Sequence, residues 1–84
     1  MDNFWTEKQK QDIDFFDENI ETWVADPLLH RKFVVISNRS IVRCHDAFDA
    51  ALRFAAVTFD EGEYIIQQVL SEDETVSFLS PALA

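Results

Sequence analysis

The chain has 84 residues, of which 48% are hydrophobic and eight are phenylalanine, and its formal net charge is −9. This apolar content is too high for a disordered tail and predicts one packed domain over residues 1–84. The negative charge disfavours nucleic acid and anionic membranes as partners, because like charges repel over about 8 Å at physiological salt.

The cellular location is predicted from features that the sequence lacks. No run of about 18 apolar residues is present to span a membrane. Residues 1–11 contain no apolar stretch typical of a secretory signal. Cys44 is the one cysteine, so an intramolecular disulfide is excluded, which is typical of a protein in a reducing compartment. We therefore expect a cytoplasmic protein with no membrane partner.

A first helix is predicted over about residues 6–25. Its apolar residues recur at spacings of three, four, three and one, which is typical of one helical face: Ile13, Phe16, Ile20, Trp23 and Val24. Thr6 is suited to cap the first turn of this helix. Pro27 ends it, because the residue before a proline avoids the α region.

A β-hairpin is predicted over about residues 32–45, because two stretches rich in β-branched residues flank Asn38 and Arg39. Asn38 suits a tight turn, whereas Arg39 stands where such a turn prefers Gly, so a longer or bulged turn is an open alternative. With a two-residue turn, strand alternation places four apolar side chains on one face, which we interpret as the core face: Phe33, Val35, Val42 and Cys44.

The opposite face of this hairpin is the candidate interaction surface. It is an apolar patch with a basic end, made of Lys32, Val34, Ile36, Ile41, Arg43 and His45. Two interpretations are open at this point. Either this face contacts a partner, or the N-terminal helix covers it with Phe16, Ile20 and Trp23.

The second half of the chain predicts another helix and another hairpin. The helix covers about residues 47–59, with Asp46 as its N-cap and an alanine-rich apolar stripe. The hairpin covers about residues 63–79, with strands over 63–70 and 75–79 and a turn over 71–74. The order α-β-β-α-β-β predicts an α+β fold with two helices packed on one face of a four-stranded, mainly antiparallel sheet.

Residues 31–69 resemble a family of small bacterial proteins of unknown function. The matching segments are RKFVVI, IVRCHDAFDAALRFAAVTF and GEYIIQQV. In that family Gly is common where Arg31 stands, and a D-G-like turn is found where Asn38 and Arg39 stand. The resemblance implies a fold, and it transfers no catalytic residue.

Motifs for catalysis, phosphate binding or metal binding are missing from the sequence: it has no Gly-rich phosphate loop, G-x-S-x-G, C-x-x-C or H-E-x-x-H. Cys44, His45 and Asp46 are adjacent, but neighbouring residues of a strand point to opposite faces and are not expected to share a proton or a metal. His30 has no identifiable partner and is interpreted as a solvated residue. We predict no catalytic, cofactor-binding or metal-binding residue.

Three functions are compatible with these features. The favoured one is a non-catalytic interaction module that binds a protein partner, or forms a homodimer, through a sheet face or an edge strand. The second is an acidic inhibitor, immunity protein or antitoxin that neutralises a basic protein through residues 1–26 and 60–84, each of which carries −6. The third is a small enzyme or ligand-binding domain that holds a carboxylate or phosphate with Lys32, Arg43 and His45.

Overall fold

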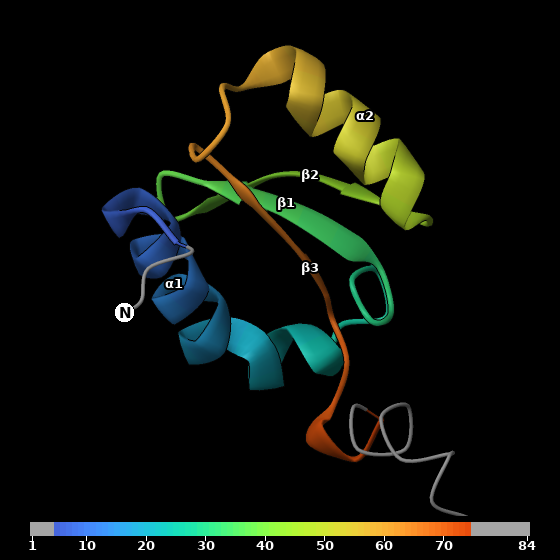
Figure 1. Ribbon diagram of the computed structural model, residues 1–84. Helices are drawn as coiled ribbons and strands as arrows, with labels where there is room; N and C mark the ends of the chain where they lie inside the picture. Colours follow the sequence, from blue (N-terminus) through green and yellow to red (C-terminus); the bar gives the residue numbers. More distant parts are fainter. Residues whose placement is uncertain (1–4, 75–84) are drawn as a thin grey trace, which may run out of the picture.

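The structure, a computed structural model, describes residues 5–74 and has two helices on opposite sides of one sheet (Figure 1). In chain order the elements are α1 (Glu7–Val24), β1 (Phe33–Ser37), β2 (Ser40–His45), α2 (Phe48–Thr58) and β3 (Ile65–Gln68). The sheet is antiparallel, with the strand order β2-β1-β3. The predicted α+β class is confirmed. The predicted fourth strand, 75–79, lies outside the described residues.

The prediction that both helices share one face is wrong, and β1 gives the reason. Val34 and Ile36 point to the α1 side of the sheet and Val35 points to the α2 side, and all three side chains are fully buried. A strand that is apolar on both faces requires cover on both faces. On the α2 side this cover comes from Ala51 and Ala55, whose small side chains allow the helix to approach Val35 closely.

Helix α1 begins at a capping box, as its first residues suggest. Thr6 accepts a hydrogen bond from the Gln9 backbone N–H at 3.0 Å, and the Gln9 side chain accepts one from the Thr6 N–H at 3.0 Å. This pair satisfies two N–H groups that the first turn leaves without helical partners. The predicted cap is confirmed. Farther along α1, Trp23 is buried against the sheet with Phe15 and Phe16 packed edge-on to its ring.

The turn of the first hairpin has two residues, Asn38 and Arg39, with φ angles of 54° and 55°. Both angles lie in the left-handed region, as a type I′ turn requires. Arginine is held there by α1: its backbone N–H donates to Asp12 Oδ1 at 2.8 Å, and its guanidinium reaches Glu18 at 3.0 Å and lies 5.5 Å from the Phe15 ring centre. These contacts offset the conformational cost of a non-glycine residue.

A β-bulge at Val42 changes the register of the hairpin beyond the turn. Ile36 pairs with Ile41 as expected, but Val35 pairs with Arg43 and Phe33 pairs with His45. An extra residue in one strand moves every later side chain to the other face. Val42 and Cys44 are consequently exposed, so the prediction that they belong to the core is wrong.

The start of α2 differs from the prediction in its cap. Its N-cap residue is Ala47, which makes no side-chain hydrogen bond, and Asp46 forms an ion pair with Lys32 instead. Asp49 lies in the first turn, where its negative charge is favourable, and pairs with Arg53 one turn later.

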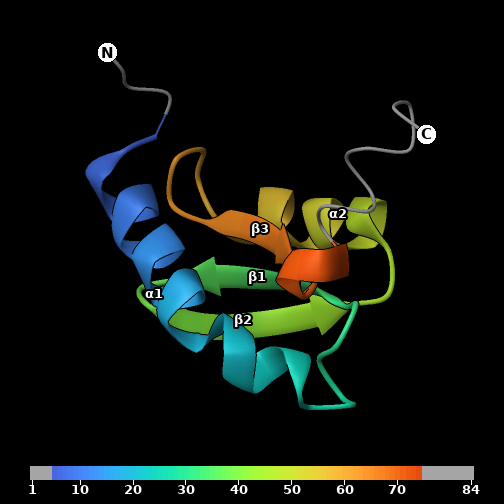
Figure 2. The same cartoon turned by 90° about the horizontal axis from the view of Figure 1, so that it is seen from below.

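The chain after β3 forms a helical turn over residues 72–74, within the predicted turn over 71–74. Ser71 caps it: the Ser71 hydroxyl accepts from the Glu74 N–H at 3.1 Å, and Glu74 accepts from the Ser71 N–H at 2.7 Å. Figure 2 shows this turn beside the end of β3, on the side of the sheet where α1 lies. Ser-x-x-Glu is a capping-box pattern, so the sequence itself indicates that this turn is helical.

Candidate interaction site

The apolar part of the predicted hairpin surface is not available to a partner. Val34 and Ile36 have no exposed surface, and Ile41 packs against the same cluster beneath α1. Of the two open interpretations, cover by the N-terminal helix is the one that the structure supports. The candidate interaction surface is therefore wrong in its apolar part.

The basic residues of that surface have separate partners. The bulge places Arg43 and His45 on the α2 side, where the Arg43 guanidinium lies 4.7 Å from the centre of the Phe54 ring and the His45 ring lies 5.7 Å from it. Lys32 precedes β1 and pairs with Asp46, which raises the pKa of Lys32 and lowers that of Asp46. These three groups do not converge on one ligand.

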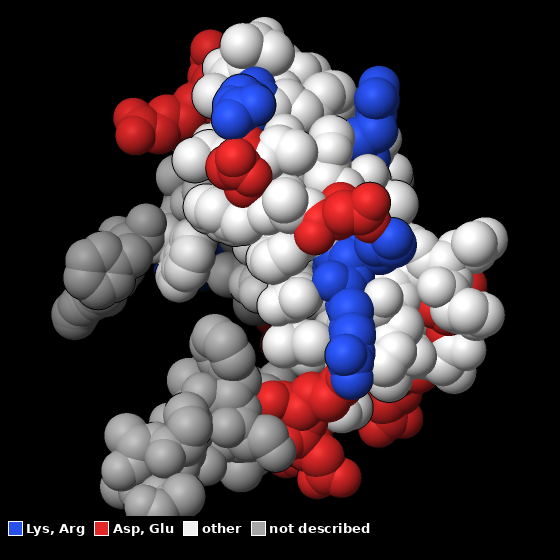
Figure 3. Space-filling model, turned by 90° about the vertical axis from the view of Figure 1, so that its right-hand side faces the viewer, with Lys and Arg blue, Asp and Glu red and all other residues white. Residues whose placement is uncertain are grey.

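The basic residues of the middle segment are mostly neutralised by neighbouring carboxylates. Figure 3 shows one face of the molecule, on which most Lys and Arg side chains lie beside Asp or Glu side chains. The ion pairs formed by the basic residues of the middle segment are Lys32–Asp46, Arg31–Glu74, Arg39–Glu18 and Arg53–Asp49. The net charge of +3 that the sequence places in residues 27–59 does not form a single basic patch on this face.

The outer edge of β3 is the sheet edge that is better suited to pairing with another strand. Within residues 5–74, β3 pairs with β1 alone. The Val69 backbone bonds to the residues that precede β1 at 2.7 and 2.9 Å, and the Glu63 carbonyl accepts from the Ser37 hydroxyl of β1 at 2.7 Å. Backbone directions alternate along an antiparallel strand, so the N–H and C=O groups of Ile66 and Gln68 point away from β1.

An apolar groove adjoins this edge on the α2 side. It has a volume of about 240 Å³, and we call it the α2-side groove. Three of its large apolar side chains are unusually exposed, namely Trp5 at 48%, Phe48 at 51% and Leu52 at 41%. The remaining lining residues come from α1, β3 and the loop before β3: Gln9, Glu61, Gly62, Tyr64, Ile65 and Ile66.

A second groove adjoins the α1 side, between helix α1 and the segment that follows β3. It has a volume of about 470 Å³, and we call it the α1-side groove. Its apolar lining comes from one stripe of α1 and from Leu70, and carboxylates lie at its rim: Phe16, Ile20, Val24, Leu70, Ser71, Glu21 and Glu72. The α2-side groove therefore lies against the start of β3, and the α1-side groove lies beside the segment that follows it.

The other edge of the sheet, β2, is poorly suited to pairing. The bulge at Val42 interrupts its ladder, and the cationic Arg43 side chain follows directly. Bulges and charged side chains are devices by which natural sheets prevent edge-to-edge pairing. In contrast, residues 65–70 contain no charged side chain.

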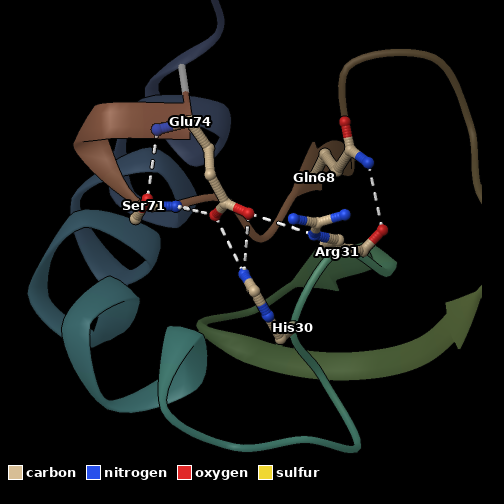
Figure 4. Close-up of polar contacts among 5 residues, drawn as sticks. All are labelled: His30, Arg31, Gln68, Ser71 and Glu74. Atoms are coloured by element: carbon tan, nitrogen blue, oxygen red, sulfur yellow. Dashed lines mark hydrogen bonds and ion pairs between the residues drawn. The ribbon is translucent and has the colours of Figure 1, made fainter. Parts of the chain in front are cut away.

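A polar cluster closes the end of β3, and Figure 4 shows it. The Glu74 carboxylate accepts from the Ser71 N–H at 2.7 Å, contacts His30 Nε2 at 2.9 and 3.0 Å, and accepts from Arg31 Nε at 3.0 Å. The Ser71 N–H and then His30 lower the pKa of Glu74 to about 2. His30 has a partner after all, which local sequence could not reveal because Glu74 lies 44 residues away.

Arg31 occupies a strained backbone position in this cluster. Its φ of 73° lies in the left-handed region, which favours glycine. The Arg31 carbonyl accepts from the Gln68 side chain at 3.0 Å, and its N–H donates to Val69 at 2.7 Å. Arg31 therefore joins the end of β3 to the start of β1 through its backbone and to Glu74 through its side chain.

Comparison with known proteins adds no family. No family model, curated protein or solved structure matches the chain. Within the described ranges, no helix has the length and apolar character to cross a bilayer. The same residues contain no group of three or more His, Cys, Asp or Glu side chains arranged to hold a metal ion. The resemblance of residues 31–69 stays a prediction.

Proposed function

We propose that this protein is a non-catalytic interaction module that binds an extended protein segment as an added strand at the outer edge of β3. The observation that carries the proposal is the combination of open backbone groups at Ile66 and Gln68 with an apolar groove beside the start of β3 and another beyond its end. Strand addition uses both features, because main-chain hydrogen bonds give affinity and pockets for alternate side chains give specificity.

The bound segment would present its side chains alternately to the two faces of the sheet. Successive residues of a strand point to opposite faces, so apolar side chains at every second position would enter the α2-side groove beside the start of β3. The four residues of β3 span about 13 Å at about 3.3 Å per residue. Such a short edge supports a weak or transient complex.

The second hypothesis, neutralisation of a basic protein, is compatible with this mode of binding. It is supported by carboxylates at the groove rims, which include Glu21, Glu61 and Glu72. The third hypothesis, a ligand site built from Lys32, Arg43 and His45, is not proposed, because Lys32 pairs with Asp46 while Arg43 and His45 lie beside the Phe54 ring. We place the module in the cytoplasm and expect neither nucleic acid nor a membrane as its partner.

The proposal is tested with two peptides, each made of alternating valine and threonine. One peptide has an uninterrupted run, and its twin has proline at a central position, which removes a backbone donor needed for strand pairing. Binding is followed by tryptophan fluorescence, to which Trp5 in the α2-side groove contributes. We expect the uninterrupted peptide to bind and the proline twin to bind at least about tenfold more weakly, a difference of about 1.4 kcal/mol. Equal binding of the two peptides would contradict strand addition.

A matched pair of protein variants locates the binding site. Gln68→Pro removes an N–H that faces the open edge, and Gln68→Ala removes the same side chain but keeps the N–H. We expect Gln68→Ala to bind the uninterrupted peptide and Gln68→Pro to lose binding while remaining folded, since proline is tolerated on the solvent side of an edge strand. If both variants bind equally well, the peptide does not pair with β3.

A further inference from the structure

The charges around the β3 edge indicate what kind of segment binds there. The strand itself is uncharged, but carboxylates lie beyond both of its ends: Glu61 and Glu63 before it, and Glu72 and Asp73 after it. Glu61 lines the α2-side groove, and Glu72 lines the α1-side groove together with Glu21.

Nearby basic side chains do not neutralise these groove carboxylates. Lys8 is paired with Glu63 at 2.9 Å, and Arg31 is paired with Glu74 at 3.0 Å. Among the ion pairs formed within residues 5–74, none involves Glu21, Glu61 or Glu72. Each groove therefore combines an apolar floor with an uncompensated negative rim.

This arrangement disfavours a second copy of the chain as the occupant. In an antiparallel pair of two β3 strands, the carboxylates before one strand would face the carboxylates after the other. In a parallel pair, each acidic end would face its own equivalent. Both arrangements place like charges side by side, which destabilises strand pairing, and the net charge of −9 on each copy opposes their approach.

We infer that the occupant is an extended segment of a different protein, in which a short run with apolar residues at alternate positions is flanked on both sides by Lys or Arg. The inference rests on the proposed strand addition and names its partner. The alternate apolar side chains fit the α2-side groove, and the flanking cations lie next to Glu61 at one end and Glu72 at the other. Complementary charges at the rim of an interface increase the association rate and select among partners.

The experiment compares two peptides with the same alternating valine and threonine run, one flanked by lysines and one by glutamates. We expect the full-length protein to bind the lysine-flanked peptide at least about tenfold more tightly than the glutamate-flanked one, and we expect this preference to shrink at about 0.5 M salt, where the Debye length is about 4 Å. Equal binding of both peptides would overturn the charge inference and leave strand addition intact.

Matched variants of the protein assign the preference to the grooves. The double variant Glu61→Gln, Glu72→Gln removes one carboxylate from each groove. The control Asp14→Asn, Asp17→Asn removes the same charge from exposed positions of α1 that line neither groove. We expect the groove variant to lose most of the preference for lysine and the control to retain it. If the two variants lose it equally, overall charge and not the grooves determines selectivity.

Light scattering after size-exclusion chromatography tests two other possible occupants of the β3 edge, which are a second copy of the chain and the chain's own predicted strand 75–79. We expect a monomer. A dimer that is lost in Gln68→Pro but kept in Gln68→Ala would overturn the inference in favour of a second copy, while strand addition would stand. A monomer that binds neither peptide would overturn strand addition itself and would favour the predicted strand 75–79 of the same chain as the occupant of the edge.

Discussion

Gln9 and Tyr64, 55 positions apart in the sequence, are joined by a hydrogen bond of 3.0 Å from the Gln9 side-chain amide to the Tyr64 carbonyl. Tyr64 immediately precedes β3, and by alternation its carbonyl points to the same outer edge as the backbone groups of Ile66 and Gln68. Helix α1 thus covers the first acceptor on this edge, and among residues 5–74 no strand pairs with the next positions. The edge is closed at its start by Gln9 and ends near the Glu74 cluster.

Proline at neighbouring positions of β3 tests which backbone N–H groups face β1 and which face the outer edge. Gln67 pairs with Val34, and its N–H faces β1, so Gln67→Pro breaks the ladder and leaves a buried acceptor unpaired at a cost of about 1–3 kcal/mol. Gln68→Pro, compared with Gln68→Ala, is expected to lower the free energy of unfolding by less than Gln67→Pro does. Urea unfolding measures both free energies. A larger cost at Gln68 than at Gln67 would mean that the assignment of inner and outer positions is reversed.

Arg39 provides a test of how the hairpin turn is stabilised. Arg39→Ala keeps a residue with positive φ and loses the contacts to Glu18 and Phe15, so we expect a loss of about 1–2 kcal/mol. Arg39→Gly loses the same contacts but relieves about 1 kcal/mol of backbone strain, so it should be more stable than Arg39→Ala. Thermal unfolding gives the order. A glycine variant less stable than the alanine variant would argue against the left-handed turn.

The Glu74 cluster predicts a dependence of stability on pH. Its pKa is lowered in the folded state from 4.5 to about 2, so the unfolded chain binds a proton more readily. The stabilisation by this carboxylate is therefore complete above pH 4.5 and is lost as the pH falls towards about 2. We expect Glu74→Gln to lower the melting temperature at neutral pH, and the difference from wild type to shrink over that acidic range.

A suitable control for the Glu74 cluster is Glu72→Gln, which removes a nearby exposed carboxylate that does not contact His30 or Arg31. Its effect on the melting temperature should be small, and the difference between this variant and wild type should not follow the same acidic transition. If the two variants behave alike from neutral to acidic pH, the cluster does not stabilise the end of β3.

The bulge at Val42 makes Cys44 a reporter of hairpin register. In the structure the thiol is exposed, whereas the register without a bulge buries it with Phe33 and Val35. We expect a thiol-specific reagent to modify Cys44 in the native protein nearly as fast as in the unfolded chain. Modification that requires unfolding would support the unbulged register and would return Arg43 and His45 to the other face.

The elements predicted correctly from the sequence are those marked by residues close together in the chain. Thr6 and the apolar spacing gave α1, and the two β-branched stretches around Asn38 gave the hairpin and its two-residue turn. The bulge was not predictable, because one unpaired residue leaves no mark on composition or on apolar alternation. That single residue exchanged the faces of Arg43 and His45 and thereby dispersed the predicted interaction surface.

The candidate site depends on relationships that periodicity does not encode. The uncharged run from 65 to 70 and the Ser71–Glu74 capping pattern were visible, but the placement of the helices on opposite faces decides where the grooves form. A strand such as β1, with Val34, Val35 and Ile36 in succession, signals burial on both faces, and this signal could have placed α1 opposite α2.

Hydrogen exchange at the β3 amides, measured by NMR, tests strand addition most directly. In the free protein we expect the N–H groups of Ile66 and Gln68 to exchange rapidly and those of Ile65 and Gln67 to be protected by β1. Adding the lysine-flanked peptide should then protect Ile66 and Gln68. Rapid exchange at both residues with the peptide bound, or full protection before it is added, would contradict strand addition at β3.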